Sequence, residues 1–139
     1  MSKKHREIIL TKEQAFSEAK RYLANAKETI LKSSIDSTGK LYEDAKYVRE
    51  GAGIAYLAAL KAFDGWLIGK GYESDKLPTS IDEYWSLRKK IPHNGVFTSN
   101  FTLAYQNLHI GAYYQGIVSV NFVKEGLKAV KDIIELLEK

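Results

Sequence analysis

The amino-acid sequence predicts an all-α fold: an antiparallel, up-and-down bundle of four long helices plus one short helix. Three observations carry this prediction. Apolar residues recur at spacings of three and four in five segments, which is the period of an amphipathic helix. Thr11 with Gln14, and Ser80 with Glu83, have the spacing of helix-capping boxes. The alternation typical of β-strands is missing apart from a short segment at residues 7–10, so we expect no sheet.

The first two helices are predicted at residues 11–33 and 41–68, joined by a turn rich in Ser, Asp, Thr and Gly. The apolar positions of the first helix are Ala15, Ala19, Tyr22, Ala26 and Ile30. The second helix carries a ridge of small residues, Gly51, Ala55, Ala59 and Ala62. A close helix–helix approach along this ridge offsets the roughly 1 kcal/mol that a mid-helix glycine costs relative to alanine. We therefore interpret Gly51-Ala52-Gly53 as a packing motif, not as a phosphate-binding loop.

The other three helices are predicted at residues 80–91, 99–113 and 120–137. The first of them is short, because Pro92 and the pair Asn94-Gly95 stop it. The second is apolar on two faces, which is typical of a helix at the centre of a bundle or at a surface shared with a partner. The third has one apolar and one charged face, so we expect it to lie against the bundle with one side in water.

Charge is distributed unevenly along the chain. Residues 1–32 contain eight Lys and Arg against four Asp and Glu, whereas residues 33–139 contain thirteen of each. We therefore predict a basic N-terminal tail at residues 1–10 and a single helical domain at residues 11–139. The first apolar run is too short for a signal peptide, and no segment is long and apolar enough to cross a membrane. We expect a cytoplasmic protein with no membrane partner.

The composition argues against several kinds of site. The chain has no cysteine, which excludes disulfides, thiolate catalysis and cysteine-ligated metals. None of its three histidines, His5, His93 and His109, follows a Glu or Asp by three residues, as the carboxylate-bridged metal sites of helical bundles require. We expect no metal and no cofactor.

Residues 91–123 contain no Asp, Glu, Lys or Arg, although these types make up 27% of the chain. Neutral amides and aromatic rings take their place, a composition typical of a contact surface with another copy or with a ligand. We predict that this uncharged stretch makes the protein a homodimer. The candidate interface residues are Phe97, Phe101, Tyr105, His109, Tyr113 and Tyr114.

Arg88 and His93 are the candidate catalytic residues, at the start of the uncharged stretch. An arginine holds a phosphate by bidentate hydrogen bonds, and a histidine near its ordinary pKa moves protons at neutral pH. Such a pair suits metal-independent cleavage of RNA, with Arg88 as phosphate anchor and His93 as general acid and base. Lys89, Lys90 and Asn94 beside them are candidate contacts to RNA or a nucleotide ligand.

The spacing of Arg88 and His93 resembles the Arg-x4-6-His signature of the HEPN superfamily, small all-α domains that include many toxin ribonucleases. The order of the helices over residues 11–137 is similar too, and in size the chain resembles an uncharacterised bacterial domain-of-unknown-function family, which implies no activity. The resemblance implies that the pair lies in a cleft where two protomers meet, and that an antitoxin-like protein is a partner. The sequence departs from the pattern at Lys89, where catalytic members often carry Asn, and at Pro92.

Two functions of different classes follow. The leading prediction is a HEPN-like binding or interaction domain that self-associates through residues 91–123. The alternative is a metal-independent, toxin-like endoribonuclease using Arg88 and His93. A third reading is a small-molecule pocket built by Trp85, Tyr105, Tyr113 and Tyr114. A purely structural role also stays open, in which Arg88 pairs with an acidic residue of its own helix and His93 caps a turn.

Overall fold

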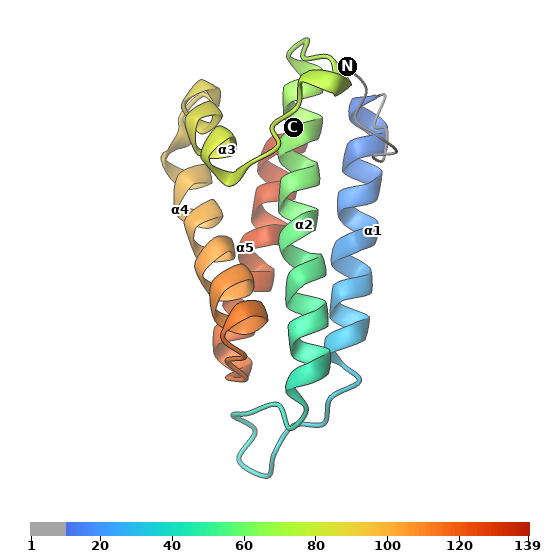
Figure 1. The fold of residues 1–139 in the computed structure, drawn as a ribbon, viewed down its shortest axis with the longest axis vertical. Helices are drawn as coiled ribbons and strands as arrows, with labels where there is room; N and C mark the ends of the chain where they lie inside the picture. Colours follow the sequence, from blue (N-terminus) through green and yellow to red (C-terminus); the bar gives the residue numbers. More distant parts are fainter. Residues whose placement is uncertain (1–10) are drawn as a thin grey trace.

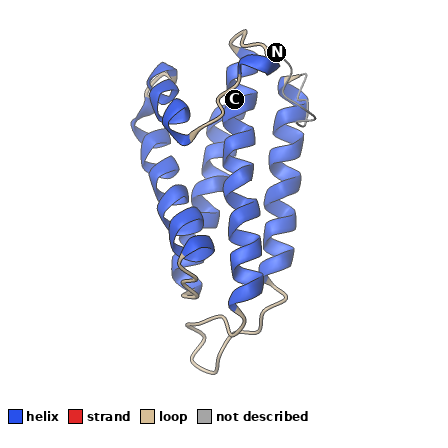
Figure 2. Cartoon of the chain, viewed as in Figure 1, coloured by secondary structure: helices blue, strands red, loops and turns tan. Residues whose placement is uncertain are grey.

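The computed structural model describes residues 11–139, which form an all-helical bundle, so the predicted fold class is confirmed (Figure 1, Figure 2). The helices are α1 (Lys12–Ile30), α2 (Ala45–Gly69), α3 (Ile81–Leu87), α4 (Asn94–Ala104) and α5 (Val120–Glu138). Two 3-10 turns, η1 (Ser74–Lys76) and η2 (Arg88–Lys90), flank α3, and a π-helical segment, η3 (Tyr105–Tyr114), continues α4. The predicted basic tail and the segment at residues 7–10 lie outside the described residues.

The chain runs up and down along the long axis of the bundle (Figure 1). Helices α1 and α2 are neighbours joined at the lower end by the loop of residues 31–44. At the upper end the chain crosses through α3 to α4, which descends on the far side of α2. Helix α5 returns behind α2 and packs against α1, α2, α4 and η3. The α4–η3 rod is thus separated from α1 by α2 and α5.

Side-chain caps begin α1 and α3 where the sequence predicts them, whereas α2 begins at Ala45 and not at the predicted residue 41. Thr11 and Gln14 form a complete capping box at α1. At α3 the Ser80 hydroxyl accepts from the Glu83 backbone N–H, but the Glu83 carboxylate accepts a hydrogen bond from the Thr79 hydroxyl. Capping by Asp44 at α2 and by Ser119 at α5 satisfies backbone N–H groups that no helical carbonyl reaches.

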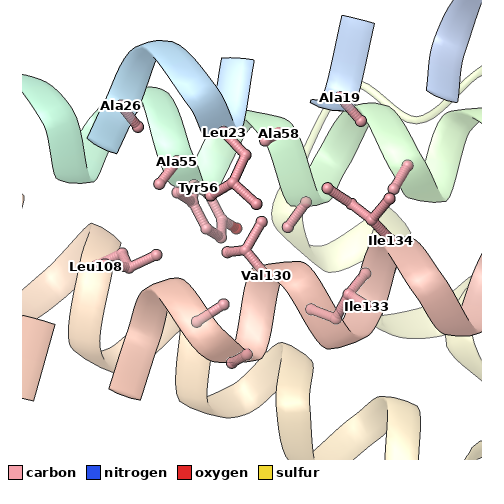
Figure 3. Close-up of a cluster of buried hydrophobic side chains, with 14 of the residues drawn as sticks. Ala19, Leu23, Ala26, Ala55, Tyr56, Ala58, Leu108, Val130, Ile133 and Ile134 are labelled. Carbon is pink, nitrogen blue, oxygen red and sulfur yellow. The ribbon is translucent and has the colours of Figure 1, made fainter. Parts of the chain in front are cut away.

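The ridge of small residues on α2 packs against α1. A Cβ atom added to Gly51 would lie 2.8 Å from the carbonyl oxygen of Ala26, so only glycine fits at this separation. Ala55 and Ala59 are fully buried on the same ridge. Ala55 belongs with Leu23 of α1 and Val130 of α5 to one buried cluster (Figure 3). The packing interpretation of the glycines is confirmed.

The prediction that α4 begins near Ser99 is wrong, because the helix begins at Asn94. His93 adopts a left-handed conformation, with φ 52° and ψ 50°, directly after Pro92. This single residue turns the chain, so Asn94 and Gly95 occupy the first helical turn, where backbone N–H groups have no helical partner in any case. The pair Asn94-Gly95 therefore follows the helix stop instead of forming it.

Segment η3 is π-helical, which the sequence analysis did not predict. Its hydrogen bonds span five residues, ending with the Gln115 N–H donated to the Ile110 carbonyl at 2.9 Å. A close approach to α5 holds it: the buried Asn107 amide donates to the Phe122 carbonyl at 2.8 Å. π-Helical geometry is rare, and where it interrupts an α-helix it frequently marks a functional site, which makes η3 a candidate part of such a site.

Candidate functional site

A cleft of about 830 Å³ lies between α2, η3 and the segment that leads into α3. We call it the aromatic cleft. Helix α2 contributes Glu50, Gly53, Ile54, Tyr56, Leu57 and Leu60. The segment at residues 78–81, together with Tyr84 of α3, forms one wall, and η3 contributes Tyr105, His109 and Tyr113 to the other. Its volume is within the range of roughly 300–1,000 Å³ that is usual for binding sites.

Three rings of η3 form a ladder along the cleft. Tyr105 and His109 stack with ring centres 5.5 Å apart, and His109 and Tyr113 stack at 6.0 Å. The spacing of four residues places these side chains on one helical face. Tyr56 of α2 packs beneath the ladder, 4.9 Å from the His109 ring and 5.9 Å from the Tyr105 ring. The predicted residues Tyr105, His109 and Tyr113 are therefore brought together.

The aromatic cleft is almost free of charge. Glu50 is the single carboxylate among the described residues that line it, and none of these residues is Lys or Arg. Burial raises the pKa of the Tyr56 hydroxyl far above its ordinary value, and the nearby Tyr105 raises it further, so Tyr56 stays neutral at physiological pH. Recognition here therefore depends on ring faces and apolar contact more than on ion pairing.

The cleft opens to solvent through apolar groups. Leu57 is 47% exposed and Tyr113 is 48% exposed, both unusual for large apolar side chains of a bundle core. A Cβ atom on Gly53 would lie 3.1 Å from the Tyr113 ring, so this glycine lets the ring lie flat against α2. This α2 wall is not among the predicted site residues. The signal was present, since Ile54, Leu57 and Leu60 repeat at helical spacing away from the ridge that packs on α1.

The predicted interface residues differ in their surroundings: Tyr105, His109 and Tyr113 line the cleft, whereas the others do not. Phe97 and Phe101 have no exposed surface and stack on each other at 5.3 Å, with Phe63 of α2 against both rings. They belong to the core of a single chain and not to its surface. Tyr114 is 73% exposed at the end of η3 but does not line the cleft, and neither does Trp85.

Arg88 and His93 are not joined to each other by any hydrogen bond or ring contact within residues 11–139. The Arg88 guanidinium lies 4.9 Å from the Trp85 ring centre and donates to the Trp85 carbonyl. His93 is exposed at the start of α4 and makes no side-chain capping bond. Arg88 thus has a structural partner, and it is not the acidic residue of its own helix that the sequence suggested.

The candidate RNA contacts lie on the same exposed turn. Lys89 and Lys90 are both exposed in η2, and the Asn94 amide donates to the Lys89 carbonyl at 3.4 Å. In the described part of the chain no group of three or more His, Asp or Glu residues is arranged to hold a metal ion. No helix among the described residues is long and apolar enough to span a bilayer.

Comparisons with known proteins match nearly the whole bundle. A family model described as Domain of unknown function (DUF5618) matches residues 14–139. A solved structure, a protein of unknown function from Dyadobacter fermentans, is similar with a TM-score of 0.77 and 29% sequence identity, over 93% of this chain and 98% of that chain. No protein with a curated description matches. The similarity includes both helices that form the aromatic cleft.

Proposed function

Given that this chain belongs to the family described as Domain of unknown function (DUF5618), we propose from its structure that it is a helical binding domain that self-associates through the aromatic cleft. The observation that carries the proposal is an open apolar surface built from the Tyr105, His109 and Tyr113 ladder and from the half-exposed Leu57. Aromatic enrichment and a lack of charge are typical of the centre of protein–protein interfaces.

Symmetry supports a second copy of the chain as the occupant. In a two-fold dimer each patch meets itself, so charges near the axis meet charges of the same sign. A surface with Glu50 as its single carboxylate and no lysine or arginine avoids that repulsion. The face of α2 from Glu50 to Leu60 is about 15 Å long, enough for several helical turns of a partner to lie along it. The near absence of charge on the cleft surface therefore favours self-association.

This proposal narrows the predicted interface within residues 91–123. Tyr105, His109 and Tyr113 stay in it, Tyr114 borders it, and the α2 residues Ile54, Leu57 and Leu60 join it. The predicted relation to HEPN domains, in which Arg88 and His93 would lie where two protomers meet, stays part of the proposal, although neither residue lines the aromatic cleft. The predicted antitoxin-like partner and cytoplasmic location are part of the same proposal.

The test uses two substitutions at matched exposure. Leu57→Glu places a carboxylate in the proposed interface, whereas Ile35→Glu places one in the loop of residues 31–44, outside the cleft; the two leucine and isoleucine side chains are 47% and 44% exposed. We expect a dimer at tens of micromolar by sedimentation equilibrium. Leu57→Glu should raise its dissociation constant by about 30-fold, equivalent to about 2 kcal/mol, and Ile35→Glu should not change it.

Two outcomes would reject the proposal. One is a wild-type protein that is monomeric at these concentrations. The other is a dimer that Leu57→Glu and Ile35→Glu weaken equally, which would place the interface elsewhere. Both variants change exposed positions, so circular dichroism and thermal unfolding should match the wild type and separate lost association from lost folding.

RNA cleavage by Arg88 and His93 stays the alternative, and it needs the guanidinium to leave the Trp85 ring and carbonyl to reach a phosphate. The double variant Arg88→Ala/His93→Ala is the test, with RNA incubated in the presence of a chelator. Loss of a measured wild-type cleavage would support the alternative. Equal behaviour of the two proteins would remove the enzyme alternative.

A further inference from the structure

A second hollow, of about 350 Å³, lies on the seam between α1 and α5. We call it the lysine groove. Its rim carries four lysines, Lys27, Lys124, Lys128 and Lys131. Its apolar lining comes from Ile30, Leu31, Tyr42 and Leu127. No acidic residue of the described chain lines it, so the groove combines an apolar floor with a single sign of charge.

The pairing of α1 with α5 makes this clustering unexpected. Further along the same antiparallel seam, the Lys20 ammonium and the Glu138 carboxylate form an ion pair at 2.8 Å. Two helical turns separate Lys20 from Lys27 on α1 and Glu138 from Lys131 on α5. The pair that corresponds to the ion pair is therefore Lys27 and Lys131, two like charges in one groove. A cross-helix ion pair is thus replaced by repulsion, which costs free energy unless an anion lies between the helices.

The lysines have little compensation from the protein. Lys128 pairs with Asp132 of its own helix at 2.9 Å, and this hydrogen bond raises the pKa of the Lys128 ammonium. Lys27, Lys124 and Lys131 are exposed and make no hydrogen bond or ion pair within residues 11–139. Three ammonium groups therefore remain for a bound anion.

The apolar floor of the groove indicates that the ligand has an apolar part as well as a charged one. Leu31 is 77% exposed, the most exposed large apolar side chain of residues 11–139. It lies one helical turn beyond Lys27, beside the partly buried Leu127 of α5. Tyr42 also lines the groove, and burial raises the pKa of its hydroxyl. A small inorganic anion would leave these apolar groups in water.

We propose that the lysine groove binds an anionic amphiphile, with a carboxylate or phosphate head among Lys27, Lys124 and Lys131 and an apolar chain over Leu31 and Leu127. Charge complementarity selects the head, and burial of apolar surface holds the chain. A free acyl anion and an anionic lipid in a bilayer share this chemistry. The groove is separate from the aromatic cleft, so the inference does not depend on self-association.

Calorimetric titration of the full chain with monomeric dodecanoate, dodecyl phosphate and dodecyltrimethylammonium tests the proposal. The two anions should bind and the cation should not. Lys27→Glu/Lys131→Glu should weaken dodecanoate binding at least tenfold, and Leu31→Ser should weaken it several-fold at unchanged charge. Lys76→Glu in η1 is the control, because it removes an exposed lysine outside the groove and should leave binding unchanged.

Further arms separate the sources of the ligand and the rival occupants. Co-sedimentation with phosphatidylglycerol vesicles, but not with phosphatidylcholine vesicles, would assign the groove to a membrane lipid. Binding of dodecanoate alone would assign it to a free acyl anion. The proposal fails if the cationic amphiphile binds as well as the anions, or if Leu31→Ser binds dodecanoate as tightly as the wild type does. It also fails if Lys27→Glu/Lys131→Glu binds dodecanoate like Lys76→Glu.

Discussion

The aromatic cleft and the lysine groove are built from the same kind of wall, the apolar face of a helix, but they differ in charge. Among the described residues, those that line the cleft between α2 and η3 include one carboxylate, Glu50, and no lysine or arginine. The groove between α1 and α5 has four lysines and no carboxylate among the residues of 11–139 that line it. Both leave a leucine unusually exposed, Leu57 in the cleft and Leu31 in the groove.

This difference indicates different partners for the two surfaces. A neutral aromatic patch can meet its own copy across a two-fold axis without repulsion. A patch of four lysines cannot, because each ammonium would face others in the second protomer. We therefore expect the cleft to be used between copies of the chain and the groove to be used for an anion. The same bundle would then hold two contact surfaces that do not compete.

The largest effect should come from a charge placed on the ladder. Tyr113→Lys should raise the dissociation constant of the dimer by about 30-fold or more, because it buries an ammonium in an apolar interface. Tyr114→Lys is the control: the neighbouring ring is more exposed, 73% against 48%, but it does not line the cleft. Sedimentation equilibrium measures both. Equal weakening by the two variants would mean that the end of η3, and not the ladder, forms the contact.

Salt should separate the two surfaces more gently. Raising the ionic strength from about 0.1 M to about 1 M shortens the Debye length from about 10 Å to about 3 Å. We expect dodecanoate binding at the lysine groove to weaken by about tenfold over this range, since exposed ammonium groups supply the attraction. Dimerisation should be unchanged or slightly strengthened, because apolar contact holds it. A dimer that dissociates in salt would contradict the assignment of the cleft.

The helices were predictable because their signals are local. The capping residue Thr11, the spacing of small residues from Gly51 and the apolar period of α5 are each recognisable within a short stretch of sequence. The start of α4 was not, since the left-handed His93 after Pro92 reassigns Asn94 and Gly95 from helix stop to first turn. The π-helical register of η3 depends on packing against α5, so it has no local signature.

The candidate sites were predictable only in part, for a related reason. Absence of charge marks residues 91–123 correctly as unusual, but a core and an interface both lack charge. Phe97 and Phe101 belong to the core, and Tyr113 to the surface. Which of these rings is buried and which is exposed depends on how the chain packs beside α2, and not on local sequence. The lysine groove was missed because Lys27 and Lys131 are distant in the sequence and meet only through the antiparallel pairing of α1 with α5.

The smallest expected effect is on the pH dependence of the free energy of unfolding, through the tyrosine that each surface buries. Burial raises the pKa of Tyr56 in the cleft and of Tyr42 in the groove above the ordinary value of 10.0, and Tyr105 raises that of Tyr56 further. Above pH 10 the unfolded chain loses these protons while the folded chain keeps them. The free energy of unfolding therefore falls as the pH rises, and the full contribution is present only below pH 10.

At about pH 11 the free energy of unfolding should fall by about 1 kcal/mol less in Tyr56→Phe than in the wild type. In Tyr42→Phe this difference should be smaller. Urea unfolding between about pH 9 and pH 11 measures both, with Tyr114→Phe as the exposed control. If Tyr42→Phe has the larger effect, the groove is the more deeply buried of the two environments. The aromatic cleft would then be too open to water to supply the apolar contact that self-association needs.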